Sequence, residues 1–355
     1  MTVSPDKPDA AATRAAVGAA PVSAVDGADG APAAPASGHL PVSADHSALP
    51  PTERRNPRTT DIDVLPTVDV LRLMNDEDGL VPGAVRSVLG ALADVVDAAA
   101  DRVRRGGRVH YYGAGSSGRI AVLDASELAP TFGLRPGVVI PHLAGGPGAM
   151  TRAVEGAEDD EARGAEEAGA DLGELDVVIG LSASGRTPYV AGALAEARAR
   201  GAYTAVITSD PGSRLLPLAD VGLVPETGPE AIAGSTRLKA TTAMKLILNS
   251  FSSALMIRLG KTYSNLMVEV SASNSKLRGR KVRILGEATG EPGAACESSL
   301  AEAEGDLRVA MVMLLGGASA AAAREALSAA AKADNGGVRA ALDRLLHFRK
   351  EVPRS

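Results

Sequence analysis

Five short apolar runs, separated by alanine-rich stretches, occupy the middle of the chain. The runs are RVHYY (108–112), GVVIPHL (137–143), DVVIGL (176–181), YTAVIT (203–208) and ADVGLV (219–224). Strands that alternate with helices predict a parallel sheet covered by helices. Nearly continuous apolar strands are typical of a sheet that is buried on both faces. We therefore expect an α/β fold.

The segments on either side of this core differ from it in composition. Residues 1–58 hold nine of the 22 prolines and no aromatic residue. Such a segment buries too little apolar surface to offset its ordering entropy, so we expect a disordered tail. Helical patterns predict helices over 67–78, from Pro82 onward, over 241–259 and within 263–286. We expect an α/β domain over 59–286 and a small helical domain over 287–355.

The composition excludes several classes of function. Only 8 of 355 residues are aromatic, Cys296 is the single cysteine, and 37 basic residues face 43 acidic ones. The charge argues against a nucleic-acid partner, and one cysteine excludes an intrachain disulfide and a multi-cysteine metal site. The five histidines show no metal-ligand spacing. No stretch resembles a signal peptide or a membrane span. We expect no metal, no cofactor, no membrane partner and a cytoplasmic location.

Two loops combine glycine with hydroxyl side chains, and each joins a predicted strand to a predicted helix. The first reads YGAGSSGR (112–119) and the second LSASGRTP (181–188). Amides at a helix N-terminus and serine hydroxyls suit a phosphate, and ligands of parallel sheets bind at the carboxyl ends of the strands. The two loops are therefore expected to face one anionic ligand. The alternatives are a tight turn for the first and a capped helix start for the second.

Acidic side chains form two candidate groups. Asp124 and Glu127 follow the first loop at i, i+3 spacing, which places them on one helix face. Glu155 and Glu158 have the same spacing on what we expect to be a second helical run, and residues 159–161 are expected to be a solvated acidic surface. Carboxylates from two elements can divide acid and base work. The spacing does not choose between Glu155 and Glu158.

A polar segment, GSTRLK (234–239), precedes the long helix predicted over 241–259. Ser235, Arg237 and Lys239 are candidates for contacts with a phosphate or a carboxylate. The alternative is a polar loop that caps the helix.

Over about 52–285 the chain closely resembles the N-acetylmuramic acid 6-phosphate etherases. The resemblance rests on seven segments: TERRNPRTTDID (52–63), MNDED (74–78), YYGAGSSGRIAVLDASELAPTFG (111–133), AVEGAEDD (153–160), SASGRTPY (182–189), GPEAIAGSTRLKATTAMKLILNSFS (228–252) and GKTYSNLMVEVSASNSKL (260–277). It implies a sugar-isomerase (SIS) core, which is a flavodoxin-like αβα sandwich, and a homodimer. The family's DASECPPT reads DASELAPT here, and the change leaves Glu127 in place.

The resemblance also implies a reaction and its residues. The D-lactyl ether of N-acetylmuramate 6-phosphate is cleaved by elimination and hydration, giving N-acetylglucosamine 6-phosphate and D-lactate. Glu127 matches the family's proton donor, and Glu158 matches its second catalytic glutamate, expected to be the base at C2. By analogy with other phosphosugar domains, the substrate would be held by Gly115, Ser116, Ser117, Gly118, Ser182, Ser184, Gly185 and Thr187. Ser235, Arg237 and Lys239 are the weaker candidates, for the sugar or the lactyl group.

Two other functions remain as alternatives. An aldose–ketose phosphosugar isomerase uses the same fold and a carboxylate base. A phosphosugar-sensing regulator uses the fold without catalysis and does not need the paired glutamates.

Overall fold

The computed structural model describes residues 49–269, 275–331 and 336–351. The chain divides into two units, Met1–Asp45 and His46–Ser355, and the first lies outside the described residues, as does the tail predicted up to residue 48. Residues 49–58, which we assigned to the same tail, are ordered. Thr52 and Asn56 are buried, and Asn56 Nδ2 donates to the carbonyl of Pro229 at 3.3 Å. The prediction was wrong there because a folded loop far along the chain supplies the partners that the composition does not reveal.

A five-stranded parallel sheet forms the centre of the fold, with the strand order β2-β1-β3-β4-β5. Each of the five apolar runs forms one strand. The strands are β1 (Val109–Gly113), β2 (Val139–Leu143), β3 (Val177–Leu181), β4 (Tyr203–Ile207) and β5 (Val221–Leu223). This confirms the α/β prediction.

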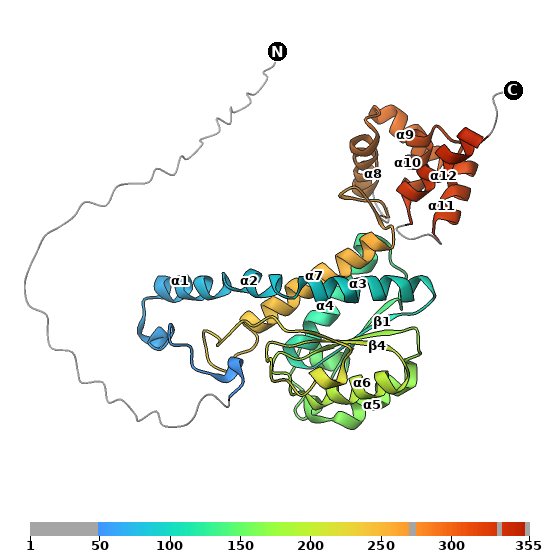
Figure 1. Cartoon of the computed structure of the whole chain (residues 1–355). Helices are drawn as coiled ribbons and strands as arrows, with labels where there is room; N and C mark the ends of the chain where they lie inside the picture. The colour runs from blue at the N-terminus through green and yellow to red at the C-terminus, as the bar shows by residue number, and fades with distance from the viewer. Residues whose placement is uncertain (1–48, 270–274, 332–335, 352–355) are drawn as a thin grey trace, which may run out of the picture. The chain divides into compact units, whose positions relative to one another are not determined.

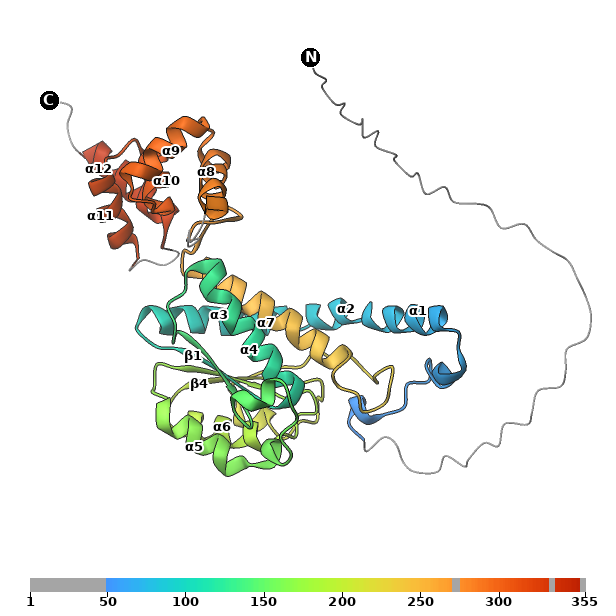
Figure 2. The same cartoon turned by 180° about the vertical axis from the view of Figure 1, so that it is seen from behind.

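Helices cover both faces of the sheet. Figure 1 and Figure 2 show α3 (Leu89–Arg104), α4 (Gly115–Phe132) and α7 (Lys239–Arg258) on one face, and α5 (Glu161–Asp171) and α6 (Pro188–Ala199) on the other. Neighbouring strand residues point to opposite faces. Thus Tyr111 packs in the α3–α4–α7 core and Tyr112 packs in the α5–α6 core. An αβα sandwich follows from this double-sided burial.

The remaining elements differ from the sequence expectations in two places. The helix predicted from Pro82 is two helices, α2 (Val81–Arg86) and α3, and it follows α1 (Thr67–Asp78). The stretch that we assigned to helices from residue 263 starts with a hairpin, β6 (Thr262–Tyr263) and β7 (Leu266–Met267), before α8 (Ser275–Thr289). Short 3-10 turns are η2 (Pro51–Glu53), η3 (Ile62–Val64), η4 (Pro147–Met150), η5 (Ala157–Asp159) and η6 (Leu216–Leu218).

The C-terminal helices surround an apolar cluster of their own. They are α8, α9 (Gly293–Glu302), α10 (Leu307–Gly316), α11 (Ala320–Ala330) and α12 (Val338–Glu351). The cluster includes the buried Cys296, and also Ile284 and Leu285 of α8, so it begins before residue 287.

Within the described ranges, no single helix is long and apolar enough to cross a membrane. Two pairs of consecutive helices reach the length and apolar composition of a membrane span only when the two helices are counted together, and these pairs are bent by 59° and 109°.

Candidate active site

Three loops leave the sheet side by side. Gly113 at the end of β1 pairs with Leu143 at the end of β2 and with Leu181 at the end of β3. The two glycine–serine loops therefore start about 5 Å apart, the spacing of neighbouring strands. The loop after β2, which carries Glu158, starts beside the first of them. The prediction that the glycine–serine loops share one edge of the sheet is confirmed.

The crevice between β1 and β3 is a topological switch point. The connection after β1 runs to α4 on one face, and the connection after β3 runs to α6 on the other. In open α/β sheets, ligands bind in such a crevice at the carboxyl ends of the strands. The geometry therefore suits a small anionic ligand held between the two loops.

The first loop is close-packed between β1 and the first turn of α4. A Cβ atom added to Gly118 would lie 2.5 Å from the carbonyl oxygen of Gly113 and 2.4 Å from Leu143 Cδ1. Because α4 begins at Gly115, the first amides of the helix have no partner within the helix. Ser116 is half-buried and Ser117 is buried at the same helix start. Backbone amides and two hydroxyls thus lie together at this helix start, an arrangement that suits a phosphate.

The second loop is held from behind by the segment after β4. The hydroxyls of Ser182 and Thr187 share a hydrogen bond of 2.8 Å, and Ser184 is half-buried. Gly185 has φ +68°, which favours glycine, and its carbonyl accepts a 2.8 Å bond from Ser213 Oγ. Ser213 therefore supports this loop, although the sequence gives no sign of that role.

Asp124 and Glu127 do not act as a pair. The carboxylate of Asp124 is buried in the core, where it accepts hydrogen bonds from Tyr111 Oη at 3.2 Å and Ser252 Oγ at 3.0 Å. Burial raises the pKa of Asp124, and the two hydroxyls oppose this shift. Glu127, one turn later on α4, is exposed. Of the two, only Glu127 is available to a ligand.

Glu158 lies in a loop and not in the helix that we expected for residues 155–161. It belongs to the single turn η5, and α5 begins only at Glu161. Gly156, at φ +73°, sits between Glu155 and Glu158 in a left-handed conformation that a continuous helix does not allow. Asp160 then caps α5 by accepting the amide of Arg163 at 2.9 Å. Glu158 is exposed.

The 228–238 loop is tied to the N-terminal segment. Gly234 N donates to the carbonyl of Thr52 at 3.0 Å, and Thr59 Oγ1 donates to that of Ala231 at 2.8 Å. Ser235 is half-buried and Arg237 is exposed. Among the described residues, no hydrogen bond that we find joins Ser235 or Arg237 to the glycine–serine loops.

Lys239 is buried and paired. Its Nζ lies 2.5 Å from Glu77 Oε2, and Glu77 also binds Arg58 Nε at 2.5 Å. Glu230, fully buried, accepts the backbone amides of Lys239 and Ala240 and so caps α7. Burial raises the pKa of Glu230, against the effect of these hydrogen bonds. In this chain Lys239 ties α1 to the start of α7.

Arg119 is a further residue that the sequence did not single out. It lies on α4 behind the first loop, and its guanidinium donates to backbone carbonyls of residues 149, 150 and 152. The only signal in the sequence is its place at the end of GSSGR. No group of three or more His, Cys, Asp or Glu side chains in the described parts of the chain is arranged to hold a metal ion.

Comparison with known proteins identifies the family. The SIS domain model matches residues 154–253, and the model of the glucokinase regulatory protein N-terminal SIS domain matches residues 91–198. The N-acetylmuramic acid 6-phosphate etherase of Thermobifida fusca is 57% identical over 265 residues, which is 75% of this chain and 87% of that protein. The chain belongs to the N-acetylmuramic acid 6-phosphate etherase family.

A second etherase extends the match over more of the chain. The etherase of Yersinia pestis (strain Pestoides F) is 50% identical over 296 residues, which is 82% of this chain and 98% of that protein. Among solved structures, a phosphoheptose isomerase from Francisella tularensis is similar over 54% of this chain and 98% of its own, with 20% identity and a TM-score of 0.44. The resemblance to the etherases and the SIS-type fold expected from the sequence are both confirmed.

Proposed function

We propose that this protein cleaves the D-lactyl ether of N-acetylmuramate 6-phosphate, releasing N-acetylglucosamine 6-phosphate and D-lactate. The observation that carries the proposal is its membership of the etherase family over most of its length. The site agrees with it. Two glycine–serine loops meet at a switch point suited to a sugar phosphate, and two exposed glutamates follow strands that end at the same edge.

The reaction proceeds as an elimination followed by hydration. In the open-chain sugar, the C1 aldehyde acidifies the proton on C2. Glu158 takes that proton, and its bonding electrons form an enolate with the C1 carbonyl. The enolate then expels the lactate oxygen from C3, which leaves a C2–C3 double bond. Glu127 gives a proton to the departing lactate oxygen. Water then adds at C3 and a proton returns to C2, so one acid and one base complete the cycle.

The binding loops supply position. The amides at the start of α4 and the hydroxyls of Ser116, Ser117, Ser182 and Thr187 hold the phosphate, as the carboxyl-edge geometry favours. Ser184 and the glycines Gly115, Gly118 and Gly185 complete the cradle. Ser235 and Arg237 contact the sugar or the lactyl group, and Lys239, directly after their loop, ties the start of α7 to α1 through Glu77.

Isotope exchange separates the two glutamates. The protein is incubated with the muramic substrate in D2O, and D-lactate release and deuterium at C2 are measured. Glu158→Gln should lose both signals, because no proton leaves C2. Glu127→Gln should lose lactate release by about 10²-fold or more, the usual range for a general acid, while the exchange of the C2 proton continues.

Glu155→Gln is the matched control, since Glu155 lies three residues from Glu158 and is also exposed. It should keep wild-type activity. Wild-type protein that releases no D-lactate refutes the proposed reaction. A ketose phosphate formed from an aldose phosphate would establish the isomerase instead, and binding without turnover would establish the regulator.

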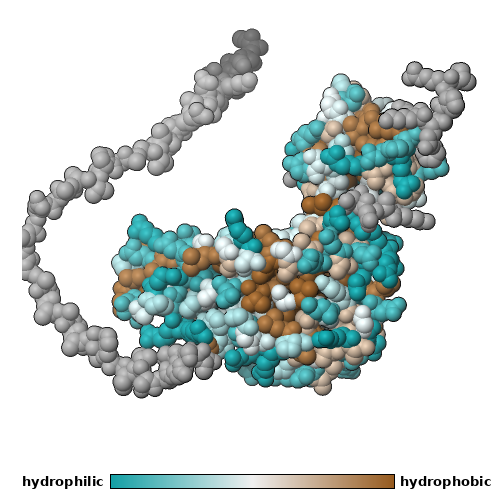
Figure 3. Space-filling view, in the orientation of Figure 1, coloured by the Kyte–Doolittle hydropathy of each residue, from teal (hydrophilic) through white to brown (hydrophobic). Residues whose placement is uncertain are grey.

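We also propose that the protein is a homodimer. The exposed fractions of Val68 and Leu71 are 51% and 60%, and their i, i+3 spacing places them on one side of α1, while Val64, in the turn before α1, is 75% exposed. Figure 3 shows further apolar surface over α7 and α3. Contiguous exposed apolar surface of this kind is typical of an interface. Light scattering should give twice the chain mass, and Leu71→Asp should lower it.

A cytoplasmic location fits the proposed substrate, because sugar phosphates do not cross membranes unaided and are consumed where they are made. Cell fractionation with detection of the protein tests this. Recovery in an extracytoplasmic fraction would contradict it.

A further inference from the structure

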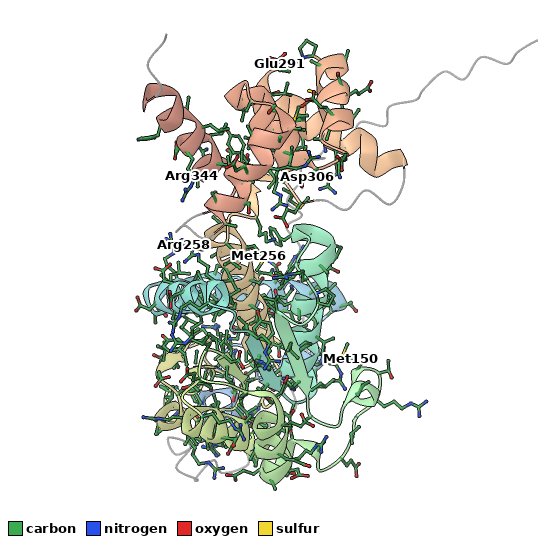
Figure 4. The ribbon with its side chains drawn as sticks, turned by 90° about the vertical axis from the view of Figure 1, so that its right-hand side faces the viewer. Met150, Met256, Arg258, Glu291, Asp306 and Arg344 are labelled. Carbon is green, nitrogen blue, oxygen red and sulfur yellow. The ribbon has the colours of Figure 1, made fainter. Side chains whose placement is uncertain are left out.

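The segment that carries Glu158 has little regular structure of its own. Between β2 and α5, over residues 144–160, it forms only the short turns η4 and η5. Figure 4 shows Met150 on a loop that projects away from the neighbouring strands and helices. The side chains of Met150 and Val154 are 38% and 46% exposed. A catalytic group on such a loop needs an anchor, because a displacement of about 1 Å costs about 10²-fold in rate.

Arg119 supplies the contacts that an anchor requires. Its Nε donates to the carbonyls of Ala149 at 2.9 Å and Met150 at 3.1 Å, and its Nη2 donates to the carbonyl of Arg152 at 3.2 Å. These three acceptors span η4 and the residues after it. One planar guanidinium therefore fixes three backbone positions of the loop at once.

Three glycines turn the backbone of this loop. Gly145 and Gly146 turn the chain at φ +84° and +71° directly after β2. A Cβ atom on Gly145 would lie 2.9 Å from Val154 Cβ, so the two arms of the loop pack closely. Gly156 turns the chain again at φ +73°, two residues before Glu158. The last carbonyl that Arg119 holds is that of Arg152, and residues 153–156 connect it to the turn that carries Glu158.

We propose that Arg119 is a positioning residue that holds Glu158 in register with Glu127; this rests on the proposed function. Arg119 and Glu127 lie on the same helix, eight residues and about 12 Å apart along its axis. Helix α4 therefore carries the acid directly and controls the base through the loop bonded to Arg119. The distance between the two carboxylates is set by one rigid element.

The competing role for Arg119 is phosphate binding, since it ends the first glycine–serine loop. The bonds argue against that role: Nε and Nη2 already donate to carbonyls that point in from the neighbouring loop. A phosphate ligand would be expected to raise KM when removed. A positioning residue would be expected to lower kcat with little change in KM, because the cradle for the phosphate is intact.

Three variants test the proposal through the kinetics of D-lactate release. Arg119→Met keeps the aliphatic stem and removes all three bonds, and kcat should fall by about 10²-fold with KM within about 3-fold of wild type. Arg119→Lys keeps the charge and can reach one or two of the carbonyls, so it should recover part of kcat. Arg152→Met removes an exposed charge from the same loop but keeps its carbonyl, and should match wild type.

Hydrogen exchange gives a readout that does not depend on the reaction. Amides of 148–158 should exchange faster in Arg119→Met than in wild type and Arg152→Met, whereas amides of β1 and α6 should be unchanged. If wild type releases no lactate but the exchange result holds, the proposed function fails and the anchor stands. A raised KM with unchanged kcat, equal losses in Arg119→Met and Arg152→Met, or unchanged exchange would overturn the proposal.

Discussion

The ion pair between Glu77 and Lys239 gives a stability prediction that can be worked from the structure. Both side chains are buried, at 3% and 1% exposure, and Glu77 is the one buried residue of α1. Burial disfavours the charged carboxylate, but hydrogen bonds from Arg58 and Lys239 outweigh it and lower the pKa of Glu77 to about 2 from an ordinary 4.5. At about 1.4 kcal/mol per pKa unit, this lowered pKa means that the ionised Glu77 carboxylate stabilises the folded state by about 3 kcal/mol at neutral pH.

The change to make is Glu77→Gln. It leaves the Lys239 ammonium buried without a counter-charge, and breaking a buried pair in this way costs about 3–5 kcal/mol. The two estimates agree in size. The double variant Glu77→Gln/Lys239→Met removes both buried charges and should recover much of the loss. Asp76→Asn, an exposed change on the same helix, should stay within about 0.5 kcal/mol of wild type.

Urea denaturation followed by circular dichroism measures these differences at pH 7, 4 and 3. Because the pKa of Glu77 is lowered in the folded state, its contribution is complete above about pH 4.5 and is lost as the pH falls towards 2. Near pH 3 the difference between wild type and Glu77→Gln should shrink to about 1 kcal/mol. A Glu77→Gln variant as stable as Asp76→Asn at pH 7, or a double variant less stable than the single one, would refute the reasoning.

Two further predictions concern α4. Gly118→Ala forces a Cβ atom against the Gly113 carbonyl and Leu143, so it should destabilise the protein by about 1–3 kcal/mol and reduce lactate release. Gly83→Ala is the control and should change neither, because an added Cβ atom there would meet no neighbouring atom within 4 Å. Urea denaturation and the lactate assay measure both effects. Asp124→Asn removes a charge that burial disfavours, so its free energy of unfolding in urea at pH 8 should equal that of wild type or exceed it by up to about 1 kcal/mol. The difference should vanish towards pH 4. A large loss of stability in the variant at pH 8 would show that the charge itself is needed.

Much of the fold could be predicted because its signals are local. The alternation of apolar runs with helical stretches is a property of neighbouring residues, and all five strands form where it occurs. The order of the glycine–serine loops along the chain predicts their shared edge, since parallel strands send their carboxyl ends to the same side. The ordered segment 49–58 was missed because its partners, among them Pro229, lie more than 170 residues away.

The sequence was sufficient for the α/β class and the family, and it named Glu127 and Glu158 as the candidate catalytic residues. Tertiary structure decided what the other polar residues do. Asp124 shares a helix with Glu127 but is turned into the core towards Ser252, and Lys239 is paired inside with Glu77, although both read as site candidates along the chain. Arg119 ends the first glycine–serine loop along the chain, but its guanidinium donates to three backbone carbonyls of the loop after β2. Spacing states which residues can share a face, whereas burial and long-range partners decide which of them meet a ligand.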